Sequence, residues 1–328
     1  MTKKIQKDML LYHYCSNGVM INILKEKQLW MTDISHSNDY NELLLFFPDV
    51  YYAIEELYNI SPFEFYYKGK TGCQAINLLL RNVDDSINKS LQIGDITSFV
   101  VCFSEKGDLL SQWRGYANDA YGFSIGFSKI ELDNYSKKEC FNGGLSFHKV
   151  EYINKDKADK IIKRHANVLL QYLKNIRIEA QKCFRKRKIN EEQTEFMMFI
   201  LLYGKIVTIM INSLRYKWES YKEEHEWRLY FNSITKDEES LFGEDSKLPE
   251  WSSFDKDLKN LRGKIDFYST EECILPYYPI TLSELSSKPI KQVYLGPKNT
   301  SYLRDVKLLF AKAKFQIPDI SKSTITYR

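Results

Sequence analysis

Apolar and polar residues alternate in short runs over much of this chain, and these runs are rich in β-branched and aromatic side chains. Such runs predict β-strands, which we place at residues 10–14, 29–32, 96–103, 121–127, 227–231, 265–268 and 290–295. Between the strands the apolar spacing changes to the helical period. It predicts helices at residues 40–58, 72–93 and 109–117. Another helix follows Ser16, its expected cap, with an apolar face formed by Val19, Met20, Ile23 and Leu24.

One long segment, residues 155–217, has helical periodicity and almost no Gly or Pro. We interpret it as a helical insertion in a single domain that spans residues 1–328. Its most apolar part, residues 196–211, is interrupted by Lys205 and is shorter than the ~20 residues that cross a bilayer. We therefore expect a buried helix there and no membrane partner. Strands mixed irregularly with helices favour an α+β fold over a doubly wound sheet.

The composition narrows the class of protein. With 44% hydrophobic and 27% charged residues the chain is typical of a soluble globular protein. Its 14 Gly and 8 Pro are too few for a sandwich of many short hairpins. A net charge of +4 is too small to indicate nucleic-acid binding without a local basic patch. Aromatic residues reach 14%, and they serve either as core or as a stacking surface for a planar ligand.

The cysteines and the N-terminal residues indicate the cellular compartment in which the protein is expected. The six cysteines are widely spaced and include no Cys-x-x-Cys pair, which argues against a structural zinc site and suits a reducing environment. The basic start of the chain is not followed by an apolar segment of signal-peptide length. We therefore expect a cytoplasmic protein.

Common catalytic and nucleotide-binding motifs are absent from the sequence. It contains no P-loop, no Gly-x-Gly-x-x-Gly, no His-Glu-x-x-His and no Gly-x-Ser-x-Gly. What remains is an ordered series of short polar and aromatic blocks. They are Tyr12-His13-Tyr14, Asn38-Asp39-Tyr40-Asn41-Glu42, Cys102-Phe103-Ser104, Ser111-Gln112-Trp113-Arg114-Gly115-Tyr116 and Glu224-His225-Glu226-Trp227-Arg228.

In this order the blocks resemble a widespread bacterial family known only as a domain of unknown function. That family has a Tyr-His-Tyr opening, an Asn-Asp-x-x-Glu loop, a Cys-Phe-Ser strand, a Trp-x-x-Tyr helix and a Glu-x-Glu-aromatic-Arg strand. The resemblance spans residues 10 to 300, and the segment near 155–215 lies outside it. It implies no activity by itself.

The layout also resembles, more distantly, the His-Tyr-Glu type of the NAD-dependent ADP-ribosyltransferase superfamily. That resemblance implies a split mixed sheet with flanking helices, and NAD as a substrate. It implies that His13 hydrogen-bonds the adenosine ribose of NAD and that Tyr116 stacks on nicotinamide. Glu226 would bind the nicotinamide ribose, and Glu224 fits the extra acid of some members. The other NAD-binding candidates are Tyr14, Ser104 and Trp113.

The chemistry explains these residue types. Cleavage of the nicotinamide–ribose bond develops positive charge on the ribose, which a nearby carboxylate stabilises. An aromatic ring holds the cationic nicotinamide by stacking, and a neutral His exchanges hydrogen bonds with ribose hydroxyls. The chain departs from the superfamily in carrying Cys102-Phe103 where many members have a Tyr, which puts the inner wall of the pocket in doubt. No metal is expected.

Each candidate also has a simpler, structural interpretation. His13 alone suits a satisfied strand residue, and Tyr116 alone suits a core position three residues from Trp113. Strand alternation places Glu226 on the face of Arg228, where the two form a surface pair. The loop residues Asn38, Asp39 and Glu42 have no counterpart in the superfamily. They either form a turn or a helix cap, or they shape the side of the site that binds the acceptor.

A basic stretch begins in the predicted insertion. Residues 155–188 contain twelve Lys or Arg against three acidic residues. Such a charge run forms either a solvated helix face or a docking surface for the phosphates of an RNA or DNA acceptor. Its densest part is Lys182, Arg185, Lys186, Arg187 and Lys188.

Three functions follow from these observations. The leading one is an NAD-dependent ADP-ribosyltransferase or NAD glycohydrolase, acting on a nucleic-acid or protein target; by extension of the resemblance this suits a bacterial toxin or an anti-phage effector. The second is a metal-dependent nuclease that uses four acids as Mg²⁺ ligands, namely Asp39, Glu42, Glu224 and Glu226. The third is a non-enzymatic nucleic-acid-binding or adaptor protein whose aromatic residues all serve as core. The sequence leaves the oligomeric state open.

Overall fold

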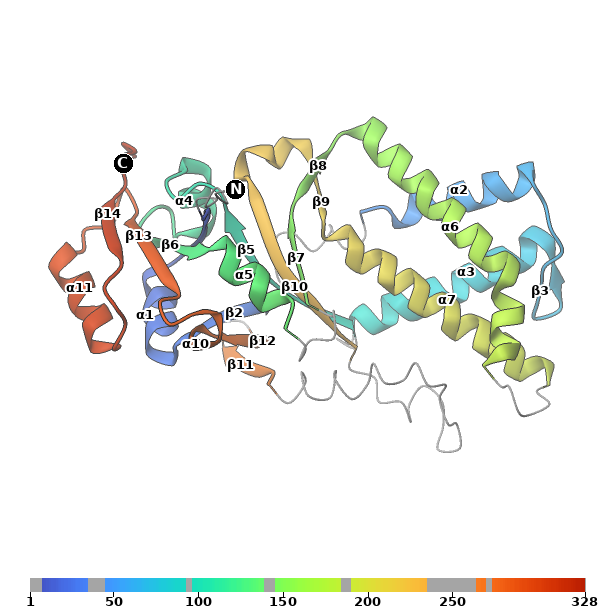
Figure 1. The fold of residues 1–328 in the computed structure, drawn as a ribbon. Coiled ribbons are helices and arrows are strands. Elements are labelled where there is room, and N and C mark those ends of the chain that lie inside the picture. The colour runs from blue at the N-terminus through green and yellow to red at the C-terminus, as the bar shows by residue number, and fades with distance from the viewer. Residues whose placement is uncertain are drawn as a thin grey trace, which may run out of the picture.

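The protein consists of a large β-sheet with small helices and a bundle of four long helices that extends from one side of it (Figure 1). We analysed a computed structural model of the chain. It describes residues 8–34, 45–92, 96–138, 145–183, 190–234, 264–269 and 273–327. The fold is mixed α and β, as expected.

The main sheet has ten strands and is mixed in direction. In sequence the strands are β1 (Leu10–Cys15), β2 (Gln28–Asp33), β5 (Ile96–Ser104), β6 (Phe123–Ser128), β7 (Ser146–Lys149), β10 (Glu226–Ile234), β11 (Asp266–Ser269), β12 (Ile274–Thr281), β13 (Ile290–Leu295) and β14 (Asp319–Lys322). Their order in space is β11-β12-β2-β5-β1-β6-β13-β14, and β10 pairs with both β5 and β7. Only the β13–β14 pair is parallel among these described strands.

Strand β5 holds the centre of the sheet, and its two edges differ. Along one edge it pairs with β10 over its whole length. Along the other edge β1 pairs with it at one position, Tyr12 opposite Ser104, and β2 pairs with it at Val100 and Phe99. Between these points the described strands leave that edge of β5 open, so the sheet is split there. A split of this kind gives side chains room to enter the sheet plane.

One face of the sheet carries its hydrophobic core. Four helices cover this face: α1 (Asn17–Glu26), α5 (Lys129–Ser136), α10 (Leu282–Leu285) and α11 (Leu303–Lys312). Their apolar residues pack with alternate positions of β5 and β10, such as Phe103 and Leu229. Ser16 caps α1 by accepting a hydrogen bond from the Val19 backbone, as expected, and Met20, Ile23 and Leu24 are buried.

The four long helices, which we call the helical arm, have a separate core. They are α2 (Phe47–Ile60), α3 (Gly72–Gln92), α6 (Lys155–Lys182) and α7 (Glu191–Ser213), with a small hairpin of β3 (Tyr66–Tyr67) and β4 (Lys70–Thr71) at the far end (Figure 1). The expected insertion therefore does not stand alone, because α2 and α3 from earlier in the chain share its core. Two short parallel strands, β8 (Glu151–Ile153) and β9 (Tyr216–Trp218), form the neck that joins α6 and α7 to the sheet.

Several predicted boundaries were wrong. The helix predicted from Tyr40 begins at Phe47 with Pro48 in its first turn, and residues 45–46 form a turn. Val19 is exposed rather than part of the buried face of α1. The helical segment predicted to reach Lys217 ends at Ser213, and Lys217 lies in β9. The prediction also missed seven of the described strands, namely β3, β4, β7, β8, β9, β12 and β14.

The strand predicted from Tyr121 begins at Phe123 because the preceding turn is unusual. Three consecutive residues, 118–120, have positive φ angles between 49° and 71°. They reverse the chain after α4 (Leu110–Tyr116), and Gly122 then lies so close to β1 that a Cβ atom would come within 2.0 Å of the Cys15 carbonyl oxygen. This turn fixes the position of α4 against the end of β1.

Helix α7 contains the apolar segment 196–211. By length and composition it is the one helix among the described residues that would be able to span a membrane, and 56% of its most apolar window is buried inside the protein. Burial of this extent is what a core helix shows, and α7 packs against α3 and α6.

Candidate functional site

A small cavity lies at the split of the sheet, and most of the predicted site residues surround it. Its lining side chains come from β1, β5, α4, the 3₁₀ helix η4 (Glu219–Glu224) and β10. They are His13, Tyr14, Cys102, Phe103, Gln112, Tyr116, Glu224 and Glu226. The cavity volume is about 60 Å³, which is room for a few water molecules.

Glu226 is the most tightly held group of the site. Its side chain is buried and accepts hydrogen bonds from Nε of Arg228 at 2.7 Å and from Nη2 at 3.1 Å. Lys217 Nζ lies 3.3 Å from the same carboxylate. Burial acts to raise the pKa of Glu226, but the charges of Arg228 and Lys217 outweigh it and lower the pKa to about 2. Glu226 is therefore ionised, and its pair with Arg228 is buried rather than on the surface as one interpretation of the sequence had it.

Lys217 connects the two acids of the site. Its Nζ donates to Glu224 at 2.7 Å as well as to Glu226, and its side chain is 1% exposed. Glu224 also accepts a hydrogen bond from the Tyr116 hydroxyl at 3.3 Å, and it is less buried than Glu226. Tyr116 is 42% exposed, so this hydrogen bond closes the outer side of the cavity.

The neck of the helical arm supplies the groups behind the acids. Lys217 belongs to β9, and Tyr152 of β8 accepts a hydrogen bond from the Glu226 backbone N–H at 2.9 Å. Arg228 donates through Nη1 to the Leu214 carbonyl just beyond α7, where the helix dipole favours a cation. The local sequence pattern does not indicate Lys217 and Tyr152 as site residues, because only the pairing of β8 with β9 brings them there.

His13 uses the open edge of β5. Its Nδ1 lies 3.0 Å from the Cys102 carbonyl oxygen, which can only accept, so Nδ1 carries the proton. Burial lowers the pKa of His13, and the hydrogen bond to Cys102 opposes this shift only in part. The ring is therefore neutral at pH 7, and Nε2 remains as an acceptor with no partner among the described residues.

Tyr14 lines the cavity, and Trp113 supports it from behind. The Tyr14 hydroxyl donates to the Lys106 carbonyl at 2.8 Å, and its ring meets that of Trp113 edge-on with centroids 4.8 Å apart. Trp113 is fully buried and donates from Nε1 to Asp108 at 2.7 Å. Ser104 donates to the backbone oxygen of Glu224 at 2.7 Å. Trp113 and Ser104 therefore hold the site together but do not line the cavity, unlike the direct contacts predicted for them.

Gln112 lines the cavity although the sequence analysis did not select it. Its side chain is 8% exposed, and its carboxamide makes no hydrogen bond to any described residue. Its amide atoms are not among the described side-chain atoms that are both fully buried and unpaired, so they face the cavity and are open to a partner there. The signal was available, because Gln112 is four residues before Tyr116 on α4 and so shares its face. Cys102 and Phe103, which replace an expected Tyr, also line the cavity, and the Cys102 thiol hydrogen-bonds Glu226.

The remaining candidates do not meet at this cavity. Asn38, Asp39, Glu42 and the run Arg185, Lys186, Arg187 and Lys188 lie outside the described residues. Lys182 is in the last turn of α6, at the other end of that helix from the neck, and pairs with Glu179 at 2.7 Å. Within the described parts of the chain, no group of three or more His, Cys, Asp or Glu is arranged to hold a metal ion.

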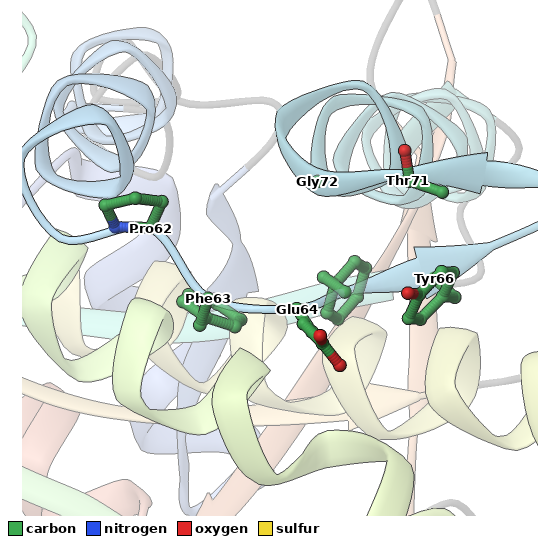
Figure 2. Close-up of a pocket in the computed structure, with 7 residues that line it drawn as sticks. Pro62, Phe63, Glu64, Tyr66, Thr71 and Gly72 are labelled. Atoms are coloured by element: carbon green, nitrogen blue, oxygen red, sulfur yellow. The ribbon is translucent and has the colours of Figure 1, made fainter.

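A larger hollow lies at the far end of the helical arm. Figure 2 shows Pro62, Phe63, Glu64 and Tyr66 on one side of it and Thr71 with Gly72 on the other. Its volume is about 410 Å³, but Glu64 is its only lining side chain that is charged at neutral pH. The smaller cavity at the split is therefore the better candidate for chemistry, because ionised acids, a neutral His and an unpaired amide meet there.

Comparison with protein families gives a match to part of the chain. Residues 112–229 match the model of a family described as "Protein of unknown function (DUF2971)". The match supports a family of unknown function, but it runs through residues 155–215, which the sequence analysis had placed outside the resemblance. It begins at Gln112 and includes Tyr116, Glu224 and Glu226. No curated protein and no solved structure matches the chain.

Proposed function

We propose that this protein cleaves the nicotinamide–ribose bond of NAD and transfers ADP-ribose to water or to a macromolecule. One observation carries the proposal. Five residues chosen from sequence order, on three segments far apart in the chain, line one cavity; they are His13, Tyr14, Tyr116, Glu224 and Glu226. Side chains that served only as core would have no reason to bring two carboxylates, Glu224 and Glu226, to the wall of a cavity.

The charges around the cavity suit this substrate. Glu224 and Glu226 line it, whereas their partners Lys217 and Arg228 lie behind them. A ligand therefore meets carboxylates first, and these favour the cationic nicotinamide ring of NAD over an anionic group. Tyr116 adds an aromatic face at the entrance, where it contributes a cation–π interaction of roughly 0.5–2 kcal/mol.

In the reaction, the bond between C1′ of the ribose and the ring nitrogen breaks. The electron pair leaves with nicotinamide, which becomes neutral, and positive charge develops on the ribose. Glu224 stabilises this charge, and Glu226 fixes Lys217 and thereby the position of Glu224. A nucleophilic oxygen or nitrogen then bonds to C1′ and releases its proton to solvent. Water yields ADP-ribose, and a macromolecular acceptor yields an ADP-ribosylated product.

The size of the cavity limits which part of NAD can enter it. At about 60 Å³ it is well below the roughly 300–1,000 Å³ of sites that enclose whole ligands. A cavity with room for a few water molecules does not hold a nicotinamide ring as it stands, so the hydrogen bond between Tyr116 and Glu224 has to open and widen it, and only the nicotinamide end of NAD then enters. The adenosine end stays outside the cavity, so in this proposal His13, which lines the cavity, contacts the nicotinamide end and not the adenosine ribose that the resemblance implied.

The test is to incubate the purified protein with NAD, with and without RNA, DNA or protein acceptors, and to follow nicotinamide release by mass spectrometry. We expect release from the wild type and a loss of about 10²-fold or more in Glu224→Gln, because that substitution removes charge stabilisation at the reacting centre. Absence of both NAD binding and nicotinamide release would overturn the proposal.

Glu223→Gln is the matched control, because Glu223 is the exposed neighbour of Glu224 in η4 and does not line the cavity. It should release nicotinamide at the wild-type rate. Glu226→Gln is compared after circular dichroism has shown that it folds, and unchanged turnover in that variant would remove Glu226 from the assignment.

A further inference from the structure

We infer that Gln112 is a specificity residue that recognises a primary carboxamide, and that it selects nicotinamide over nicotinic acid at this site. The inference rests on the proposed function for the identity of the ligand, but its structural basis is independent. Gln112 is 8% exposed, lines the cavity and has no hydrogen-bond partner among the described residues. The amide atoms of Gln112 do not belong to the fully buried, unpaired side-chain atoms of the described residues, so they face the cavity, where a partner from outside the chain can satisfy both the donor and the acceptor.

The chemistry of a carboxamide identifies that partner. The side chain of Gln112 offers one acceptor oxygen and two N–H donors. A primary amide on the ligand offers the same groups in the same plane, so the two amides form a pair of hydrogen bonds with each other. The Nε2 atom of His13, also without a partner in the described structure, is an acceptor for the second N–H of such a ligand.

A carboxylate in the same place would be rejected for two reasons. It has no N–H to donate to Gln112 or to His13, so both acceptors stay unsatisfied. It would also face Glu224 and Glu226, which line the same small cavity. Nicotinic acid and the dinucleotide that carries it therefore bind more weakly than their amide counterparts.

The test uses Gln112→Leu and three probes that need no catalysis: nicotinamide, benzamide and nicotinic acid. Binding is measured by ligand-observed NMR titration, and folding by thermal unfolding of the free protein. In the wild type we expect both amides to bind at least tenfold more tightly than nicotinic acid. In Gln112→Leu we expect at least a tenfold loss of amide binding and an unfolding temperature equal to or higher than that of the wild type, because leucine replaces an amide that makes no hydrogen bond to the described chain and has a similar volume.

Gln292→Leu is the matched control, because Gln292 is a partly buried glutamine that does have partners. It accepts from the Tyr12 hydroxyl at 2.6 Å and donates to Asp319 at 3.1 Å. It should therefore lower the unfolding temperature and leave the amide preference of the cavity unchanged.

The outcomes separate this inference from the proposed function. Amide-selective binding that Gln112→Leu abolishes supports the inference even if NAD is not cleaved, in which case only the proposed reaction fails. The inference is overturned if the wild type binds neither amide, if Gln112→Leu binds nicotinamide as the wild type does, or if Gln112→Leu destabilises the protein as much as Gln292→Leu. Cleavage of NAD with no preference over its nicotinic acid analogue would overturn the inference and leave the reaction standing.

Discussion

The sheet and the helical arm bury polar groups in different ways. Among the described residues, the buried polar side chains of the arm helices are hydroxyls, namely Ser90, Thr194 and Ser213. Thr194 and Ser213 donate to backbone oxygens of their own helix, at 3.1 and 3.2 Å. The charged side chains buried in the described structure lie elsewhere: Lys217, Glu226 and Arg228 form one cluster where the arm's neck meets the sheet, and Asp33 lies at the end of β2.

The difference shows where the molecule buries charged groups at a cost in folding free energy, namely at the neck and not in the arm. Buried ion pairs are costly to desolvate, and well-packed apolar residues in their place are often equally or more stabilising. The arm obtains a stable core without them. The cluster at the neck is therefore explained better by the requirements of the site than by stability, and it makes the position of Glu224 depend on the base of the arm through Lys217.

The largest test of this comparison is Arg228→Met. It leaves Glu226 buried with one cation instead of two, and we expect it to cost about 3–5 kcal/mol in urea unfolding at pH 7. Arg81→Met on α3 should change stability by no more than about 0.5 kcal/mol, because Arg81 is exposed and has no ion-pair partner among the described residues. A loss below about 1 kcal/mol in Arg228→Met would show that the cluster is not tightly coupled.

A second substitution sharpens the result. In the double variant Glu226→Leu with Arg228→Met both charges are replaced by apolar groups, so much of the lost stability should return. The same double variant should release no nicotinamide. Recovery of stability without recovery of activity would separate what the cluster does for folding from what it does for the reaction.

Acid should weaken the cluster before it weakens the arm. Glu226 has a pKa of about 2 in the folded protein, below the value of 4.5 for a free glutamate, so its contribution is complete above pH 4.5 and is lost as the pH falls toward 2. The lost stability amounts to up to about 3 kcal/mol. His13 adds a separate loss that begins near pH 6.5, because its lowered pKa means that the unfolded chain takes up a proton first. Urea unfolding from pH 7 to pH 2 measures both.

Two variants assign these losses. The double variant at 226 and 228 should lose the dependence between pH 4.5 and 2 and keep the part that begins near pH 6.5. Leu169→Ala, in the core of the arm, should lower stability by a similar amount at every pH, because it removes only apolar contacts. If both variants show the wild-type pH profile, the acid sensitivity belongs to other groups.

Sequence order grouped residues that line one cavity, whereas it did not indicate how the helices of the arm associate. The Tyr-His-Tyr strand, the α4 helix and the Glu-x-Glu strand were predicted in order, and their side chains do meet, because strand and helix periods determine which face each residue takes. The resemblance consists of short blocks, and these do not predict how large the cavity between them is. Gln112 was not selected as a site residue because the aromatic residues Trp113 and Tyr116 of the same helix were chosen instead. The i, i+4 spacing nevertheless places Gln112 next to Tyr116.

Other parts of the structure depend on long-range pairing that the local pattern does not contain. Lys217 was predicted to be the last residue of the helical segment 155–217. Only the parallel pairing of β8 with β9 places it in a strand beside the acids. The shared core of α2, α3, α6 and α7 likewise requires knowledge of which apolar faces meet. Periodicity predicted each of these helices but not their association.

The smallest test asks whether local structure also differs between the two regions. Asn190 caps α7 in the arm, and its side chain and that of Gln193 form a reciprocal capping box, whereas Ser16 caps α1 beside the sheet. We expect Asn190→Ala and Ser16→Ala each to cost about 1 kcal/mol in urea unfolding, with neither cost depending on pH, because each removes one hydrogen bond to a backbone N–H at an exposed helix start. Comparable costs would show that the regions obey the same local rules and differ in their buried charges. A cost several times larger for Asn190→Ala would mean instead that the arm depends on its helix ends, and the contrast between an apolar arm and a charged neck would then be too simple.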